Sequence, residues 1–207
     1  MTGSTLGIVD RVNLFARRIP VWLVYGLVAL PAPYLFYLAA TGGLGVEPIS
    51  ALEHEYGELA LKLLIAGLCI TPLRRFLGVN LMKFRRAIGV MAFAYVFAHL
   101  GVWLFLDVQD WGRIWADIVK RPYITIGMVG FVLLVPLAVT SNNLSLRWLG
   151  PLWRKLHLLV FPAAILAGLH FVMLRKGVQI EPLLYLGTIL ALVGIRFRLR
   201  DGKIVRA

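Results

Sequence analysis

The chain has 207 residues, of which 60% are hydrophobic and only 15% are charged, and its formal net charge is +12. Soluble domains carry about 45–50% apolar and about 25% charged residues, so this composition indicates a protein whose surface faces lipid. The positive charge does not indicate a nucleic-acid partner, because the basic residues form short tracts beside apolar runs. Cys69 is the only cysteine, which excludes an intrachain disulfide and cysteine-ligated zinc or iron–sulfur sites.

Six apolar runs follow one another along the chain, and a transmembrane helix needs about 20 such residues to cross about 30 Å of hydrocarbon. Pro31 and Pro33 interrupt the first run, Lys62 lies in the second, and the sixth is short. The sequence therefore predicts an all-α, polytopic helical bundle that forms a single domain over residues 1–207. Its six transmembrane spans are expected at about residues 21–40, 58–72, 87–106, 123–140, 156–174 and 182–195.

The distribution of basic residues predicts the orientation of these spans. With six spans, both terminal segments and the loops at 73–86 and 141–155 lie on one side and carry 16 Lys and Arg residues, whereas the segments on the other side carry 5. Because short cytoplasmic loops are enriched in Lys and Arg, this bias predicts that both termini are cytoplasmic. The loops contain no nucleotide-binding motif, and no separate domain outside the membrane is expected.

Two histidines lie at matching depth in the third and fifth predicted spans. His99 is thirteen residues, about 20 Å, from the cytoplasmic end of its span at Arg86, and His170 is about 22 Å from Lys155 at the same end of the fifth span. Ionisable side chains inside a membrane are costly and usually face the bundle interior or a cofactor. Two imidazoles at one depth on separate helices predict axial ligation of a haem iron. Neutral imidazoles bonded only to neighbouring helices are the alternative.

His157 predicts a second haem nearer the cytoplasm, because it precedes His170 by thirteen residues, or about 20 Å of helix. The matching residue on the third span is Arg86, so the second ligand of this inner haem is left open. A straight helix would turn His157 and His170 to different sides, and Pro162 between them could kink or rotate the helix. Arg86 and Arg154 are candidate partners of the inner haem propionates.

The remaining charged residues allow several interpretations. His54 precedes the second predicted span beside acidic residues, which indicates either a solvated helix start or a contact with a quinone, a flavin or a partner. Zinc, copper and proton-relay sites are disfavoured, because the third, fourth and fifth spans contain no Asp or Glu. Further propionate candidates, which topogenic signalling explains equally well, are Arg85 and Arg147 inside and Arg113, Arg121 and Arg175 outside.

Several segments resemble the MsrQ (YedZ) family of haem-binding membrane subunits, which is related to ferric reductase-like transmembrane domains. They are RRAIGVMAFAYVFAHL, KRPYITIGM and PLAVTSNNLSLRWLGPLWRKLH, followed by the LH of His170. The second span of that family is similar to HEYGELALKLLIAGLCITPLRR. The resemblance covers about residues 15–200, and the haem histidines of the family fall on His99, His157 and His170.

The resemblance implies a b-type haem carrier in the bacterial inner membrane that holds one or two haems, and also FMN, for which no residue indicates a site. It would pass electrons from quinol or a cytoplasmic flavin reductase to a periplasmic molybdenum-cofactor subunit that reduces methionine sulfoxide. The chain would then be an electron-transfer subunit without a complete substrate-reducing site of its own. The alternatives are a stand-alone ferric or oxygen reductase and a non-redox small-solute transporter.

Overall fold

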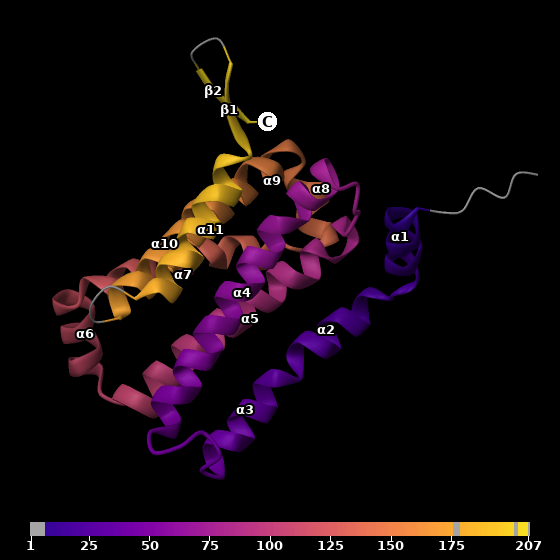
Figure 1. Cartoon of the computed structure of the whole chain (residues 1–207). Helices are drawn as coiled ribbons and strands as arrows, with labels where there is room; N and C mark the ends of the chain where they lie inside the picture. The colour runs from indigo at the N-terminus through magenta and orange to yellow at the C-terminus, as the bar shows by residue number, and fades with distance from the viewer. Residues whose placement is uncertain (1–6, 176–178, 201–202, 207) are drawn as a thin grey trace, which may run out of the picture.

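The computed structural model describes residues 7–175, 179–200 and 203–206, which form a bundle of helices followed by a short β-hairpin (Figure 1). The α-helices are α1 (Ile8–Arg18), α2 (Val21–Ala29), α3 (Pro31–Ala40), α4 (Pro48–Phe76), α5 (Arg85–Val102), α6 (Trp111–Lys120), α7 (Pro122–Val139), α8 (Asn143–Leu149), α9 (Pro151–Leu156), α10 (Val160–Leu174) and α11 (Ile180–Gly194). Two 3₁₀ turns, Met82–Phe84 and His157–Leu159, precede α5 and α10, and a π-helix, Trp103–Val108, follows α5. Strands β1 (Phe197–Arg200) and β2 (Lys203–Arg206) pair antiparallel.

Five helical stretches in this part of the chain are long and apolar enough to cross a membrane. They are Val21–Ala40, Pro48–Phe76, Met82–Val108, Pro122–Val139 and Pro151–Leu174, and α11 is a shorter apolar helix. Five of the predicted spans are thus confirmed as candidate spans, whereas the sixth span and the orientation stay predictions. The second span is longer than predicted, because α4 runs for 29 residues and contains His54, which we had expected ahead of the span.

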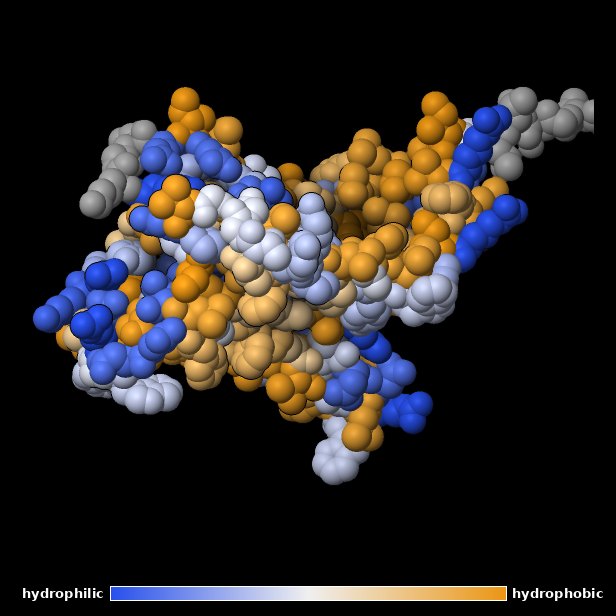
Figure 2. Space-filling view, turned by 90° about the horizontal axis from the view of Figure 1, so that it is seen from below, coloured by the Kyte–Doolittle hydropathy of each residue, from blue (hydrophilic) through white to orange (hydrophobic). Residues whose placement is uncertain are grey.

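The centre of the bundle is formed by α4, α5, α7 and α10, with α11 packed against α10 and α4 (Figure 1). Five of the described hydrophobic residues at the helix contacts have no exposed surface, and apart from Ile189 they are alanines: Ala87, Ala92, Ala163 and Ala164. Small residues allow helix backbones to approach closely, which drives helix association in lipid. Figure 2 shows the molecule from the α6 end, where hydrophobic residues cover much of the outside and hydrophilic residues gather in separate groups. This exterior is that of a multi-pass membrane protein.

Helices α2 and α3 form one span that breaks immediately before Pro31, a residue that cannot donate a helical hydrogen bond. Buried tyrosines of neighbouring helices reach carbonyl groups on either side of the break. The Tyr95 hydroxyl donates to the Val28 carbonyl, and the Tyr56 hydroxyl donates to the Ala32 carbonyl, both at 2.7 Å. These bonds attach to α4 and α5 a span that has no fully buried residue of its own.

The two ends of the bundle are built differently. One end, called the α9 end below, carries α1, α8, α9 and the β-hairpin, and the opposite α6 end carries α6 (Figure 1). At the α6 end the π-helix stops at Gln109, which has a left-handed backbone with φ 54°, and Asp110 then caps α6 by accepting a hydrogen bond from the Arg113 backbone N–H at 2.7 Å. The hairpin at the α9 end adds a two-stranded element outside the bundle to the predicted all-α fold.

Candidate functional site

A cavity of about 300 Å³ lies between α4, α5, α7 and α10, towards the α6 end of the bundle. This α6-end cavity has mostly apolar walls, and its ionisable and hydroxyl-bearing lining residues are Ser50, Glu53, His54, Glu58, His99, Asp107, Arg121, Tyr123 and His170. Three of the four histidines therefore surround one cavity. An apolar cavity with a few convergent polar groups is the usual form of a cofactor site.

His99 of α5 and His170 of α10 lie side by side at this cavity. Their ring centroids are 6.2 Å apart, and the ring planes cross at 79°. The structure thus brings together the two imidazoles that the sequence placed at one depth. His54 also lines the cavity, and its Nδ1 lies 2.7 Å from the Ser50 carbonyl one turn earlier in α4.

Both rings are oriented by backbone carbonyls of neighbouring helices, not of the helices that carry His99 and His170. Nδ1 of His99 lies 2.8 Å from the Glu53 carbonyl of α4, and Nδ1 of His170 lies 2.7 Å from the Tyr123 carbonyl of α7. Because a carbonyl oxygen only accepts, Nδ1 must carry the proton in each ring, and Nε2 keeps its lone pair. A hydrogen bond from Nδ1 to a carbonyl is the usual support for an imidazole that binds a metal through Nε2.

Gly57 and Gly127 leave the space that these two rings fill. A Cβ atom at position 127 would lie 2.8 Å from His170 Nδ1, and one at position 57 would lie 3.1 Å from His99 Nδ1. The first distance is closer than Cβ atoms approach other atoms in proteins, so position 127 requires glycine for the ring to stay in place. We assigned neither glycine a role from the sequence, although a glycine in the interior of a helical pattern often has a packing or functional reason.

This geometry fits a haem iron held between two imidazoles. With metal–nitrogen bonds of about 2 Å, imidazoles on opposite sides of one iron have centroids about 6 Å apart, in agreement with the 6.2 Å between His99 and His170. Among the residues that the structure describes, no group of three or more His, Cys, Asp and Glu is suited to a metal ion. The α6-end cavity therefore has the donor set of a bis-histidine haem.

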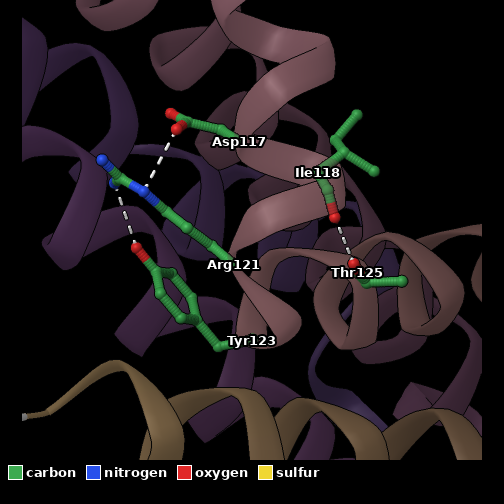
Figure 3. Close-up of polar contacts among 5 residues, drawn as sticks. All are labelled: Asp117, Ile118, Arg121, Tyr123 and Thr125. Atoms are coloured by element: carbon green, nitrogen blue, oxygen red, sulfur yellow. Dashed lines mark hydrogen bonds and ion pairs between the residues drawn. The ribbon is translucent and has the colours of Figure 1, made fainter.

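Arg121, between α6 and α7, lines the same cavity and is held by two neighbours (Figure 3). Its Nε lies 3.1 Å from Asp117 Oδ1, and its Nη1 donates to the Tyr123 hydroxyl at 3.3 Å. The hydrogen bond to Tyr123 and the charge of Asp117 raise the pKa of Arg121 above its ordinary value, so the guanidinium stays charged. In the same view the Thr125 hydroxyl donates to the Ile118 carbonyl at 2.5 Å and connects α7 to α6.

Tyr123 connects this cation to the histidine pair, because its hydroxyl accepts from Arg121 and its carbonyl accepts from His170. Of the three arginines expected on the outer side, Arg121 is the one that lines the α6-end cavity. Arg113 does not line it, and the guanidinium of Arg175 lies over the Phe171 ring, 5.8 Å from its centroid. Arg121 is therefore the candidate partner for a haem propionate at this end.

A second cavity, of about 520 Å³, lies towards the α9 end and is lined by His157. The His157 ring stacks on Trp153 with centroids 3.8 Å apart, and its Nδ1 lies 3.0 Å from the Trp153 carbonyl. Nε2 is buried, and none of the described residues bonds to it. This unused lone pair fits a ligand to a second haem iron. The 3₁₀ turn at His157–Leu159, which lies before Pro162, interrupts the helix, and the two histidines line separate cavities.

Basic side chains surround the α9-end cavity. Its lining includes Lys83, Arg85, Arg86 and Arg154, but not Arg147. Arg86 also donates from Nη1 to Asn143 Oδ1 at 2.8 Å. Cations beside an apolar cavity suit the propionates of a haem. His157 is the sole imidazole among the lining residues, so the second ligand at this end stays open.

The two cavities are adjacent and share lining residues. Leu64 of α4 and Leu134 of α7 line both of them. Phe131 lines the α6-end cavity and Phe93 lines the α9-end cavity, and their rings stack with centroids 5.7 Å apart and planes at 12°. Two cofactors in these cavities would therefore be close neighbours along the membrane normal.

Residues 56–168 of this helical bundle match the family model of the ferric reductase like transmembrane component, so the chain belongs to that class of membrane proteins. The chain is 48% identical, over 85% of its length and 82% of the relative, to the protein-methionine-sulfoxide reductase heme-binding subunit MsrQ of Agrobacterium fabrum. It is 44% identical to the protein of that name from Brucella anthropi, over 84% of this chain and 79% of the relative, and 44% identical to that from Brucella ovis, over 83% and 79%. The chain therefore belongs to the MsrQ family, as the resemblance predicted. No solved structure matches the chain.

Proposed function

We propose that the chain is the b-type haem electron-transfer subunit of a methionine sulfoxide reductase system. The observation that carries this proposal is the pair formed by His99 and His170, whose free Nε2 atoms and centroid distance of 6.2 Å suit one iron between two helices. The MsrQ relatives support it, because their name describes heme-binding subunits of such a reductase.

In this proposal the residues of each cavity have defined tasks. His99 and His170 would hold the iron of the α6-end haem, and Arg121 would bind a propionate. His157 would hold the iron of a second haem in the α9-end cavity, with Arg86 and Arg154 beside its propionates. A bound haem supplies one-electron transfer between ferric and ferrous iron, while the apolar walls exclude water and the carbonyls of the neighbouring helices keep the imidazoles in place.

The predicted orientation gives the electron path a direction. With six spans in the bacterial inner membrane and both termini in the cytoplasm, the α6 end faces the periplasm. Electrons would arrive from quinol or from a cytoplasmic flavin reductase, and FMN belongs to the proposal as a further cofactor. They would leave at the α6 end towards a periplasmic molybdenum-cofactor subunit that reduces methionine sulfoxide. The chain itself would reduce no substrate.

The test is the visible spectrum of the purified protein and of its histidine variants. Reduction by dithionite should produce the α and β bands of a b-type haem, and the haem-to-protein ratio should show one or two haems. His99→Ala and His170→Ala should each remove the same haem, and His157→Ala should remove a different one. His54→Ala is the matched control, because His54 lines the α6-end cavity without belonging to the pair. Unchanged haem content and midpoint potential in His99→Ala would contradict the pairing.

The alternative functions make different predictions for the same preparation. A small-solute transporter would be colourless after purification. A stand-alone ferric or oxygen reductase would be reoxidised as fast by ferric citrate or oxygen as by a periplasmic methionine sulfoxide reductase. We expect rapid reoxidation only by the reductase, measured as loss of the ferrous bands in a stopped-flow spectrometer.

A further inference from the structure

A charged cluster faces the lipid midway along α4. Lys62 Nζ lies 2.7 Å from Glu58 Oε1, and the Tyr185 hydroxyl of α11 donates to the same oxygen at 3.3 Å. The side chain of Lys62 is 53% exposed and that of Glu58 is 28% exposed. Lys62 is fourteen residues, about 21 Å, from either end of α4, so it lies near the middle of a hydrocarbon layer about 30 Å thick.

Stability does not explain an ion pair at this position. Apolar side chains of similar size are often as stabilising as a desolvated ion pair, or more so. Ionisable residues within membrane spans usually face the bundle interior or a polar pathway and serve function. Lys62 instead has half of its side chain on the outer surface. A polar ligand that approaches from the lipid would therefore explain the position of the cluster.

Glu58 and Lys62 can form further hydrogen bonds with such a ligand. Both contacts of Glu58 fall on Oε1, and Oε2 accepts from none of the residues placed by the structure. Lys62 uses one of its three N–H donors, for Glu58. In hydrocarbon, where water is absent, unused donors and acceptors are costly, so a ligand that satisfies them would be favoured.

The cluster adjoins the histidine pair. Glu58 lines the α6-end cavity, and it directly follows Gly57, whose missing side chain makes room for the His99 ring. Glu58 thus belongs both to the cavity that suits a haem and to the group that reaches the lipid through Lys62. A molecule bound at the cluster from the lipid side would lie next to the α6-end cavity.

We propose that Glu58, Lys62 and Tyr185 form a binding site for the headgroup of a lipid-soluble hydroquinone, an inference that rests on the proposed function and assigns a site to one of its donors. One ring hydroxyl donates to Glu58 Oε2, a ring oxygen accepts from the Lys62 ammonium, and the apolar tail stays in the lipid. A water-soluble flavin or nicotinamide does not suit a cluster that opens to hydrocarbon. An acidic residue on a partner's transmembrane helix would satisfy Lys62 but would leave Glu58 Oε2 unused.

Photolabelling tests the position of this site. The probe is an azido derivative of decylubiquinol, added without oxygen to the haem-loaded wild-type protein in lipid nanodiscs, with the haem already reduced, and activated by light. Mass spectrometry of the peptides should place the label on α4 around Glu58 and Lys62 and on α11 around Tyr185, and excess decylubiquinol should suppress it. Labelling confined to other helices would overturn the proposal.

Substitutions test the contacts. Lys62→Met and Glu58→Gln should each weaken binding of decylubiquinol, the reduced form that carries the ring hydroxyls, at least tenfold. Lys62→Arg should retain most of this binding, and the haem content of Lys62→Met should not change. Thr188→Val is the matched control, because Thr188 is an exposed polar residue of α11 whose hydroxyl bonds to the Leu184 carbonyl. Wild-type affinity in both Lys62→Met and Glu58→Gln would contradict the site.

The readouts separate this inference from the proposed function. Haem content and reduction by dithionite are measured on the same samples, and a protein without haem refutes the proposed function itself. Haem-loaded variants that bind decylubiquinol normally refute only the hydroquinone site. If Lys62→Met loses a co-purifying membrane partner while decylubiquinol binding stays normal, the cluster binds a helix and the hydroquinone site is refuted.

Discussion

The His99 ring packs tightly against Gly57, with Nδ1 3.1 Å from the position that a Cβ would take. His170 and Gly127 repeat this relationship at 2.8 Å on the other side of the cavity. In each case a helix that carries neither His99 nor His170 supplies both the space and the carbonyl that orients the ring. The candidate site is therefore built by four helices, although only α5 and α10 carry the histidine pair.

Gly127→Ala should displace the His170 ring, because its Cβ would lie 2.8 Å from Nδ1. Forcing a methyl group into a filled space costs about 1–3 kcal/mol, so haem retention in the α6-end cavity should fall while any haem beside His157 is unaffected. Haem-to-protein ratios and redox titrations measure this. Gly187→Ala is the control, since a Cβ there meets nothing within 4 Å. Equal haem content in both variants would show that the space beside Gly127 is not needed for haem binding.

Arg121→Gln should lower the midpoint potential of the α6-end haem, because a nearby cation stabilises the reduced form, which carries less positive charge. An exposed ion pair contributes about 0.2–1 kcal/mol, which corresponds to a shift of about 10–40 mV for one electron. A spectroelectrochemical titration measures the shift. Arg113→Gln, on α6 but outside the cavity, should leave the potential unchanged, and equal shifts in both variants would argue against a specific propionate contact.

Tyr95→Phe should loosen the attachment of the first span. It removes the hydrogen bond to the Val28 carbonyl, and such interhelical bonds contribute about 0.6–1.7 kcal/mol in membrane proteins. We expect a lower midpoint of thermal unfolding in nanodiscs, with normal haem content. Tyr34→Phe removes the hydroxyl of an exposed tyrosine on α3 and should have no effect. A stability loss in Tyr34→Phe as large as that in Tyr95→Phe would exclude the specific bond as the cause.

The predicted orientation can be tested with reporter fusions. Green fluorescent protein fused after Ala207 should fluoresce, because it folds in the cytoplasm, and alkaline phosphatase inserted at the turn near Gly42 should be active, because it requires the periplasm. A fluorescent fusion at Gly42 together with an active phosphatase at the C-terminus would reverse the assignment of the α6 and α9 ends.

The proximity of His99 and His170 could be predicted from the sequence because depth along a helix is simple arithmetic. Each residue adds about 1.5 Å, and the basic residues at the helix ends provide a common origin. Rotation around the helix axis could not be predicted, since the 3₁₀ turn at His157–Leu159 changes which side His157 faces. Pro162 suggested an irregularity in this helix but did not locate it.

The parts of the site that escaped prediction are those without a side-chain signature. The carbonyls of Glu53 and Tyr123 orient the imidazoles, but backbone groups are the same in every residue. The length of α4 was underestimated because its acidic first half indicated a solvated segment, whereas the structure directs Glu53 and Glu58 towards the α6-end cavity. Glu53 and Glu58 face a cavity inside the protein, and hydropathy alone does not distinguish such residues from those of a loop.

The hydrogen bonds from Nδ1 of His99 and His170 to Glu53 and Tyr123 also bear on the speed of electron exchange. Because each imidazole is anchored at its far nitrogen by a rigid helix, a change in the charge of an iron between them would move the surrounding atoms very little. A small structural response means a low reorganisation energy. A centre that reorganises little can accept and release one electron quickly at a small driving force, which is what a relay between two slower chemical reactions needs.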